Sequence, residues 1–80
     1  GDKDWAVCYS TFYAIAEFIK ANKALATETK LCIVLPYLKH EAKSVRYSAL
    51  IPIAEFVAAN NALAMEETLK LILPCLMDDL

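Results

Sequence analysis

The chain has 80 residues and a mass of 8.9 kDa, a length that allows one small domain and excludes a second. Apolar residues make up 59% of it and it has a single glycine, which excludes a disordered or linker-like chain. The net charge of −2 is unevenly distributed: residues 1–19 are weakly acidic, residues 20–46 are basic and residues 47–80 are acidic. Six basic residues spread over the basic stretch are typical of a solvated helix surface, so we do not expect nucleic acid as a partner.

Apolar residues recur with helical spacing in four stretches of the chain. The first helix is expected over residues 5–21 and the second over residues 26–39. The third and fourth are expected over residues 43–59 and 64–77. In the first and third stretches the apolar face is broad and leaves one narrow stripe uncovered. We therefore expect two alternating types of helix, joined into antiparallel pairs by short connections.

Three residue types mark the ends and bends of these helices. Asn22 and Asn60 stand where the longer helix of each pair should end, and Asn tolerates the left-handed conformation that ends many helices. Pro36 and Pro74 recur at the same place in the shorter helices, where the loss of a backbone hydrogen bond predicts a kink. Pro52 has no counterpart in the first pair, and we expect a local bend there.

The chain is an internal duplication with an offset of 38 residues. Residues 40–77 match residues 2–39 at 17 of 38 positions, and the densest run pairs the sequence IAEF at 15–18 with the same sequence at 53–56. We expect a single domain, 1–80, built from one unit at 2–39 and a second at 40–77. The predicted fold class is all-α, with four helices as two tandem helical pairs that form a short α-solenoid. A compact four-helix bundle is the alternative.

The chain resembles the HEAT repeat family over nearly its whole length, with armadillo and other helical-pair repeats as near competitors. Val45, Arg46, Ala49 and Leu50 match the Val-Arg-x-x-Ala-Leu pattern that opens the second helix of a HEAT pair, after a Leu-rich first helix. The family also tends to have an Asp in the turn, which forms a ladder with that Arg. Asp2, His40 and Asp78 hold this turn position and Cys8 holds the place of Arg46. His40 and Cys8 depart from the pattern, so the resemblance predicts that the ladder is incomplete.

The resemblance implies a non-enzymatic protein-binding or scaffold module whose second helices line the partner-binding side. The expected binding residues are those of the narrow stripe on each second helix, with Tyr13 and Ile51 as its large apolar groups. They are Ser10, Tyr13, Glu17, Lys20, Ser48, Ile51, Glu55 and Ala58.

The phase of the repeat suggests an alternative function. The chain opens with a second helix and closes with a first helix, and neither end has the polar outer face of a capping repeat. The chain is therefore expected to be a fragment of a longer array, a unit whose ends are covered by another copy, or a designed repeat. The alternative function is a self-assembling structural unit, with a closed homodimer favoured. The residues expected to self-associate are Trp5, Val7, Phe12, Leu73 and Leu76.

Catalytic, metal and membrane functions find little support in the residues. The three cysteines, Cys8, Cys32 and Cys75, show no CxxC spacing and do not pair with His40 as helical metal ligands would. No glycine-rich loop or acid-base pair indicates an enzyme or a cofactor, and the longest uncharged stretch, 5–16, is too short to span a membrane. An odd number of cysteines predicts reduced thiols and hence, for a natural protein, an intracellular setting in the cytoplasm or nucleus.

Overall fold

The computed structural model describes residues 2–78, with side chains over residues 5–78. It confirms an all-α fold with four main helices, each followed by a short 3-10 helix, labelled η. In chain order the elements are α1 (Asp2–Ala21), η1 (Lys23–Leu25), α2 (Glu28–Val34), η2 (Leu35–Lys39), α3 (Lys43–Ala59), η3 (Asn61–Leu63), α4 (Glu66–Ile72) and η4 (Leu73–Met77).

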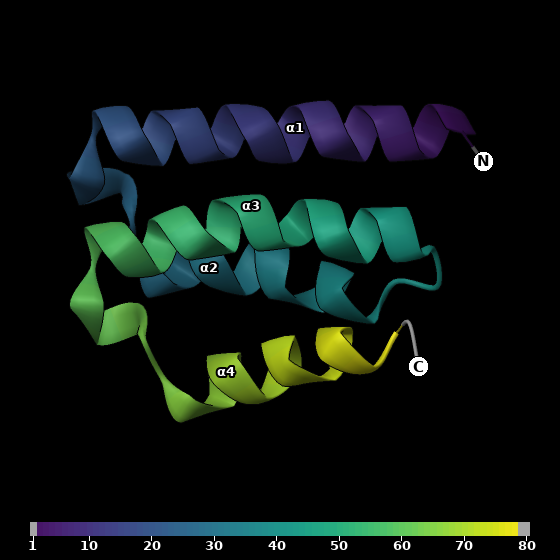
Figure 1. The fold of residues 1–80 in the computed structure, drawn as a ribbon. Coiled ribbons are helices and arrows are strands. Elements are labelled where there is room, and N and C mark those ends of the chain that lie inside the picture. Colours follow the sequence, from purple (N-terminus) through teal and green to yellow (C-terminus); the bar gives the residue numbers. More distant parts are fainter. Residues whose placement is uncertain (1, 79–80) are drawn as a thin grey trace.

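The helices are arranged as two stacked pairs in two layers. Helices α1 and α3 lie side by side and run in the same direction, while α2 and α4 return in the opposite direction (Figure 1). The contact between α1 and α3 is the most extensive in the molecule, and η2 packs on both α3 and α4. Parallel neighbours are what the stacking of repeated pairs produces, whereas an up-and-down bundle has antiparallel neighbours. The molecule is a slab of 33 × 27 × 17 Å.

The longer helices end at the predicted asparagines, although by a different device from the one expected. Asn22 and Asn60 have extended backbones, with φ of −142° and −140°, and no residue in the described range has a positive φ. Each asparagine caps the 3-10 helix that follows it. Asn22 Oδ1 accepts a hydrogen bond from the Ala24 amide at 3.2 Å, and Asn60 Oδ1 accepts one from the Ala62 amide at 3.1 Å. The asparagines therefore start a new element and need no left-handed turn.

The predicted kinks at Pro36 and Pro74 take the form of a change in helix type. Helix α2 ends at Val34 and η2 begins at the next residue, with Pro36 in its first turn. Helix α4 passes into η4 in the same way, with Pro74 in the equivalent place. Proline is tolerated in the first turn of a helix because its missing amide has no intrahelical partner there.

The core lies between the two units rather than inside either of them. One cluster of buried apolar side chains is drawn from α1, α2, η2, α3 and the segments around η1 and η3, whereas α4 adds only partly buried ones. Its members are Phe12, Ile19, Ala26, Leu31, Val34, Leu38, Val45, Ala49, Ile53, Phe56 and Leu63. Each unit therefore depends on the other to bury its apolar face.

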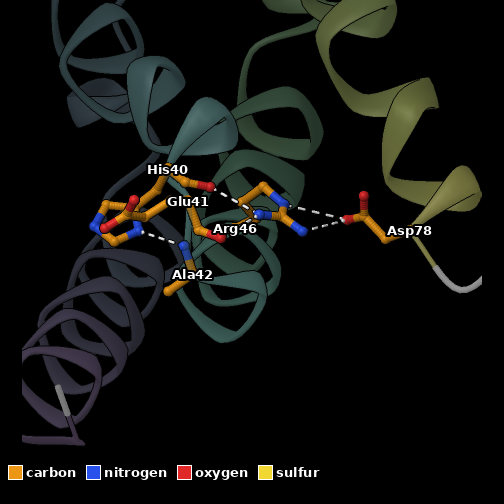
Figure 2. Close-up of polar contacts among 5 residues, drawn as sticks. All are labelled: His40, Glu41, Ala42, Arg46 and Asp78. Carbon is orange, nitrogen blue, oxygen red and sulfur yellow. Dashed lines mark hydrogen bonds and ion pairs between the residues drawn. The ribbon is translucent and has the colours of Figure 1, made fainter.

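Arg46 ties the turn between the units to the last turn of the chain, as Figure 2 shows. Its guanidinium donates to the carbonyl oxygens of His40 at 2.8 Å and Glu41 at 2.9 Å, and to Asp78 Oδ2 at 3.2 Å. Both Arg46 and Asp78 are about four-fifths buried, so this ion pair is shielded from solvent. In the first unit Cys8 and His40 hold the two equivalent positions, so this ion pair has no counterpart there. The side chain of Asp2 lies outside the described residues.

We expect the same substitution to have very different effects on the free energy of unfolding at two equivalent positions. Phe56→Ala should lower the free energy of unfolding by about 3–5 kcal/mol, because Phe56 is fully buried. Phe18→Ala, 38 residues earlier, should change it by about 0.5 kcal/mol or less, because Phe18 is exposed. Urea unfolding followed by circular dichroism at low protein concentration measures both. Equal effects would contradict the stacked arrangement.

Removal of the Arg46 guanidinium should destabilise the chain. Arg46→Met keeps the apolar stem but leaves two carbonyls and a shielded carboxylate without their donor, and we expect a loss of about 2–3 kcal/mol in the free energy of unfolding. Lys20→Met, which removes a cation from a solvent-exposed ion pair, is the control and should leave the unfolding midpoint unchanged. An Arg46→Met chain as stable as the original would show that the bridge contributes nothing.

Candidate protein-binding surface

A shallow apolar hollow lies between α1 and α3, the two second helices of the repeat. Trp5 and Tyr9 line it from α1, and Tyr47 and Ile51 line it from α3, with two serines, Ser44 and Ser48, on the α3 side. The rings of Trp5, Tyr9 and Tyr47 and the aliphatic side chain of Ile51 form its walls, and the rings also carry polar groups. The hollow is therefore apolar with hydroxyl groups at its edge, a combination suited to a protein partner.

An aromatic row runs along α1 beside this hollow. The ring centroids of Trp5 and Tyr9 are 5.8 Å apart, and those of Tyr9 and Tyr13 are 6.5 Å apart in a stacked arrangement. The three residues are spaced by four, so successive turns of the helix place their rings on one side. All three rings are exposed, although each is large and apolar. On α3 the ammonium group of Lys43 lies 5.8 Å from the centroid of the Tyr47 ring.

A charged cluster stands where α1 and α3 approach their C-terminal ends. Lys20 Nζ lies 3.1 Å from Glu17 Oε2 and 4.0 Å from Glu55 Oε2, so one lysine bridges the two second helices. The hydrogen bond and charge of Glu17, with a smaller effect of Glu55, raise the pKa of Lys20 above its usual value. The lysine is therefore cationic at every physiological pH, and its exposed ammonium can donate to a partner's acceptor.

The structure places the residues of the predicted stripe unequally. On α1 all four are exposed, as predicted. On α3 Ala58 is exposed, whereas Ile51 and Glu55 are half-buried and so less exposed than predicted. The prediction that Ser48 is exposed is wrong. Its side chain is 4% exposed and its hydroxyl donates to the Ser44 carbonyl at 2.7 Å. A hydroxyl held in this way satisfies its own helix and contacts no partner.

The residues expected to self-associate contain one error. Trp5, Val7, Leu73 and Leu76 are exposed, as that prediction requires. Phe12 is 4% exposed and belongs to the core, where its ring meets the edge of the Tyr37 ring at 5.2 Å between centroids. The broad apolar face of α1 did not reveal which part of it the neighbouring elements cover.

Four residues that line the hollow were not among those predicted to bind: Ser44, Tyr9, Tyr47 and Trp5, the last of which was expected to self-associate. Tyr9 and Tyr47 both border the hollow, and they are equivalent in the repeat, where tyrosine matches tyrosine. Their identity in both units was the available signal. A helical projection places both tyrosines beside the polar stripe rather than on it. Such a projection treats one helix alone, so it does not show which side chains border the space between two helices.

Residues 5–78 also bear on metal binding and on membrane insertion. In that range no three His, Cys, Asp or Glu side chains stand close enough to share a metal ion. The ring of His40 is used locally, since its Nδ1 accepts a hydrogen bond from the Ala42 amide at 3.0 Å. Across the helices described, none has the length and apolar content to cross a membrane. The three cysteines are unpaired, with Cys32 exposed and the other two half-buried.

Comparisons with family models, with curated proteins and with solved structures give no match to this chain.

Proposed function

We propose that this chain is a non-enzymatic protein-binding module of the HEAT-repeat type, and that it binds a partner segment in the hollow between α1 and α3. The observation that carries the proposal is the exposed aromatic row of Trp5, Tyr9 and Tyr13 beside that hollow. Trp and Tyr are enriched among the residues that dominate binding energies. Their rings offer large apolar areas, and they lose little side-chain entropy when a partner orders them.

The chemistry of the hollow favours a particular kind of segment. Its floor accepts an apolar or aromatic side chain, because Ile51 and the rings of Tyr9 and Tyr47 line it. The Lys20 ammonium, toward the C-terminal ends of the helices, favours a neutral carbonyl oxygen there, because Glu17 and Glu55 beside it repel a carboxylate. We propose a peptide segment with an apolar anchor and an acceptor further along its length.

The HEAT assignment and an intracellular setting, cytoplasmic or nuclear, are part of the same proposal. The assignment is supported by the ion pair of Arg46 and Asp78, which stand at the ladder positions of that family. The setting is supported by the exposed thiol of Cys32, because an exposed thiol is readily oxidised in extracellular compartments.

A second candidate function, a structural unit that assembles with itself, is supported by a different observation. Large apolar side chains are exposed at both ends of the stack, with Val7 and Phe18 on α1 and Leu69 on α4 and Leu76 on η4. These side chains lie outside the hollow, so the two functions are compatible in one molecule.

Selection from a displayed library of random peptides tests the binding proposal. Enriched peptides should carry the anchor and acceptor, and their binding should shift the fluorescence of Trp5, the only tryptophan in the chain. Tyr9→Ala should weaken that binding by about tenfold or more, since it removes a central ring of the row. Ile33→Ala removes an apolar side chain on α2 that is more exposed than Tyr9 and should leave the affinity unchanged.

Two outcomes would reject the binding proposal. One is a selection that enriches no peptide above background. The other is a set of peptides whose affinity is the same for the original chain and for Tyr9→Ala, since these would bind elsewhere on the molecule.

A further inference from the structure

Equivalent residues of the two units have the same chemistry but different burial at the start of the stack. Val7 and Phe18 on α1 are each 66% exposed, whereas Val45 and Phe56, their equivalents on α3, are each 1% exposed. The side chains are identical in each pair, so the difference lies in the neighbour. Within the described residues unit two has unit one packed before it, whereas no element packs on the outer face of α1. The outer face of α1 is therefore the kind of surface that this fold covers with a preceding unit.

The opposite difference is found at the end of the stack. Leu31 and Leu38 in the first unit are 0% and 5% exposed, whereas their equivalents, Leu69 and Leu76, are 49% and 76% exposed. Here the first unit has a following unit packed on it and the second unit does not. The two ends of the molecule are thus the two halves of the contact that joins the units inside it.

A hollow at this second end marks where a following unit would be seated. It is lined by Val57 from α3 and by Ala64, Leu69 and Ile72 from α4 and the residues before it, with Thr68 also in its wall. The equivalents in the first unit are fully buried in the core cluster that also contains Phe56; they are Ile19, Ala26, Leu31 and Val34. The buried Thr68 hydroxyl has no hydrogen-bond partner in the described part of the chain.

One hydrogen bond joins the two units, and the residues equivalent to its donor and its acceptor stand at opposite ends of the stack. Asn60 Nδ2 donates to the Ala26 carbonyl at 2.8 Å and so joins the second unit to the first. The equivalents are Asn22 at the start of the stack and Ala64 in the wall of the hollow. Asn22 is held by the same bond to the amide two residues on as Asn60 is, so its amide group is oriented alike.

We propose that this chain associates head to tail with a second copy of itself, repeating the contact that joins its own two units. Phe18 of one copy enters the hollow between Val57 and Leu69 of the other, and Asn22 donates to the Ala64 carbonyl. The occupant is a second copy because the chain itself carries the side chains that fill this kind of seat, at the positions that the internal contact uses. The proposal does not rest on the binding of a peptide in the hollow between α1 and α3.

The geometry of this contact differs from that of the closed dimer expected from the sequence. The two surfaces are different, so the contact is heterologous and leaves one unused end on each side of the pair. With the 38-residue spacing continued, Asp2 of one copy falls at the same repeat position as Asp78 of the other, so the junction between the two chains lies there. Phe18 and Asn22 lie at the opposite end of α1 from this junction.

Two variants that each spoil one end test the proposal. Phe18→Glu removes the apolar knob and Leu69→Glu charges the hollow; both residues are exposed in the single chain, so each variant should fold with unchanged helix content by circular dichroism. Ile33→Glu charges an exposed position on α2 that belongs to neither end and serves as the control. Sedimentation velocity over a concentration series gives the mass of each variant and of equimolar mixtures.

The expected results form a pattern that only a head-to-tail contact produces. The original chain and the Ile33→Glu control should grow in mass with concentration, and each end variant alone should stay at 8.9 kDa over the same range. A mixture of the two end variants should form a one-to-one complex of twice that mass and nothing larger, because one intact contact remains. The association should weaken by about tenfold or more in each single variant.

Three results would overturn the proposal. The first is an original chain that stays at 8.9 kDa up to millimolar concentration, which would leave a different protein or a further repeat as the occupant. The second is a Leu69→Glu chain that still dimerises while Phe18→Glu does not, the mark of a closed contact between two α1 faces. The third is a mixture of the two variants that remains monomeric.

Discussion

The packing of α1 on α3 is the contact on which the remaining structure depends. Each unit is a helical pair whose shorter arm, α2 or α4, is too brief to bury a core of its own. Burial is therefore achieved across the unit boundary, where Leu31 of one unit and Phe56 of the other join a single cluster. The same contact sets α1 and α3 parallel and close, which creates both the hollow between them and the two unmatched ends.

Much of this arrangement could be predicted from the residues, because the duplication shows that the helices come as two similar pairs. A 38-residue offset with tyrosine, asparagine and proline in matching places predicts four helices in two types, and the structure has them. The lack of a counterpart to the Arg46–Asp78 ion pair in the first unit could also be predicted, because Cys8 lacks the charge of Arg46. A helical wheel, however, assigns a side chain to a side of its own helix and does not say whether a neighbour covers that side.

The errors follow from that limit. Ser48 lies on the polar side of α3, yet α1 is near enough to bury it, and its hydroxyl turns back to the helix. Phe12 is one of many apolar residues on α1, and its burial depends on the position of Tyr37 in η2. The asparagines mark the correct ends because the chain must turn there, but the capped 3-10 helices that follow are a local solution that composition does not reveal.

The 3-10 helices around Pro36 and Pro74 have a consequence for the length of the return arm. A 3-10 helix rises about 2.0 Å per residue and an α-helix about 1.5 Å, so a five-residue segment such as η2 spans about 2.5 Å more than it would as α-helix. The outgoing helix α3, with 17 residues, spans about 26 Å. Stretching the shorter arm lets it cover more of the outgoing length before the next second helix begins. The prolines thus act as spacers that bring the lengths of the two arms closer together.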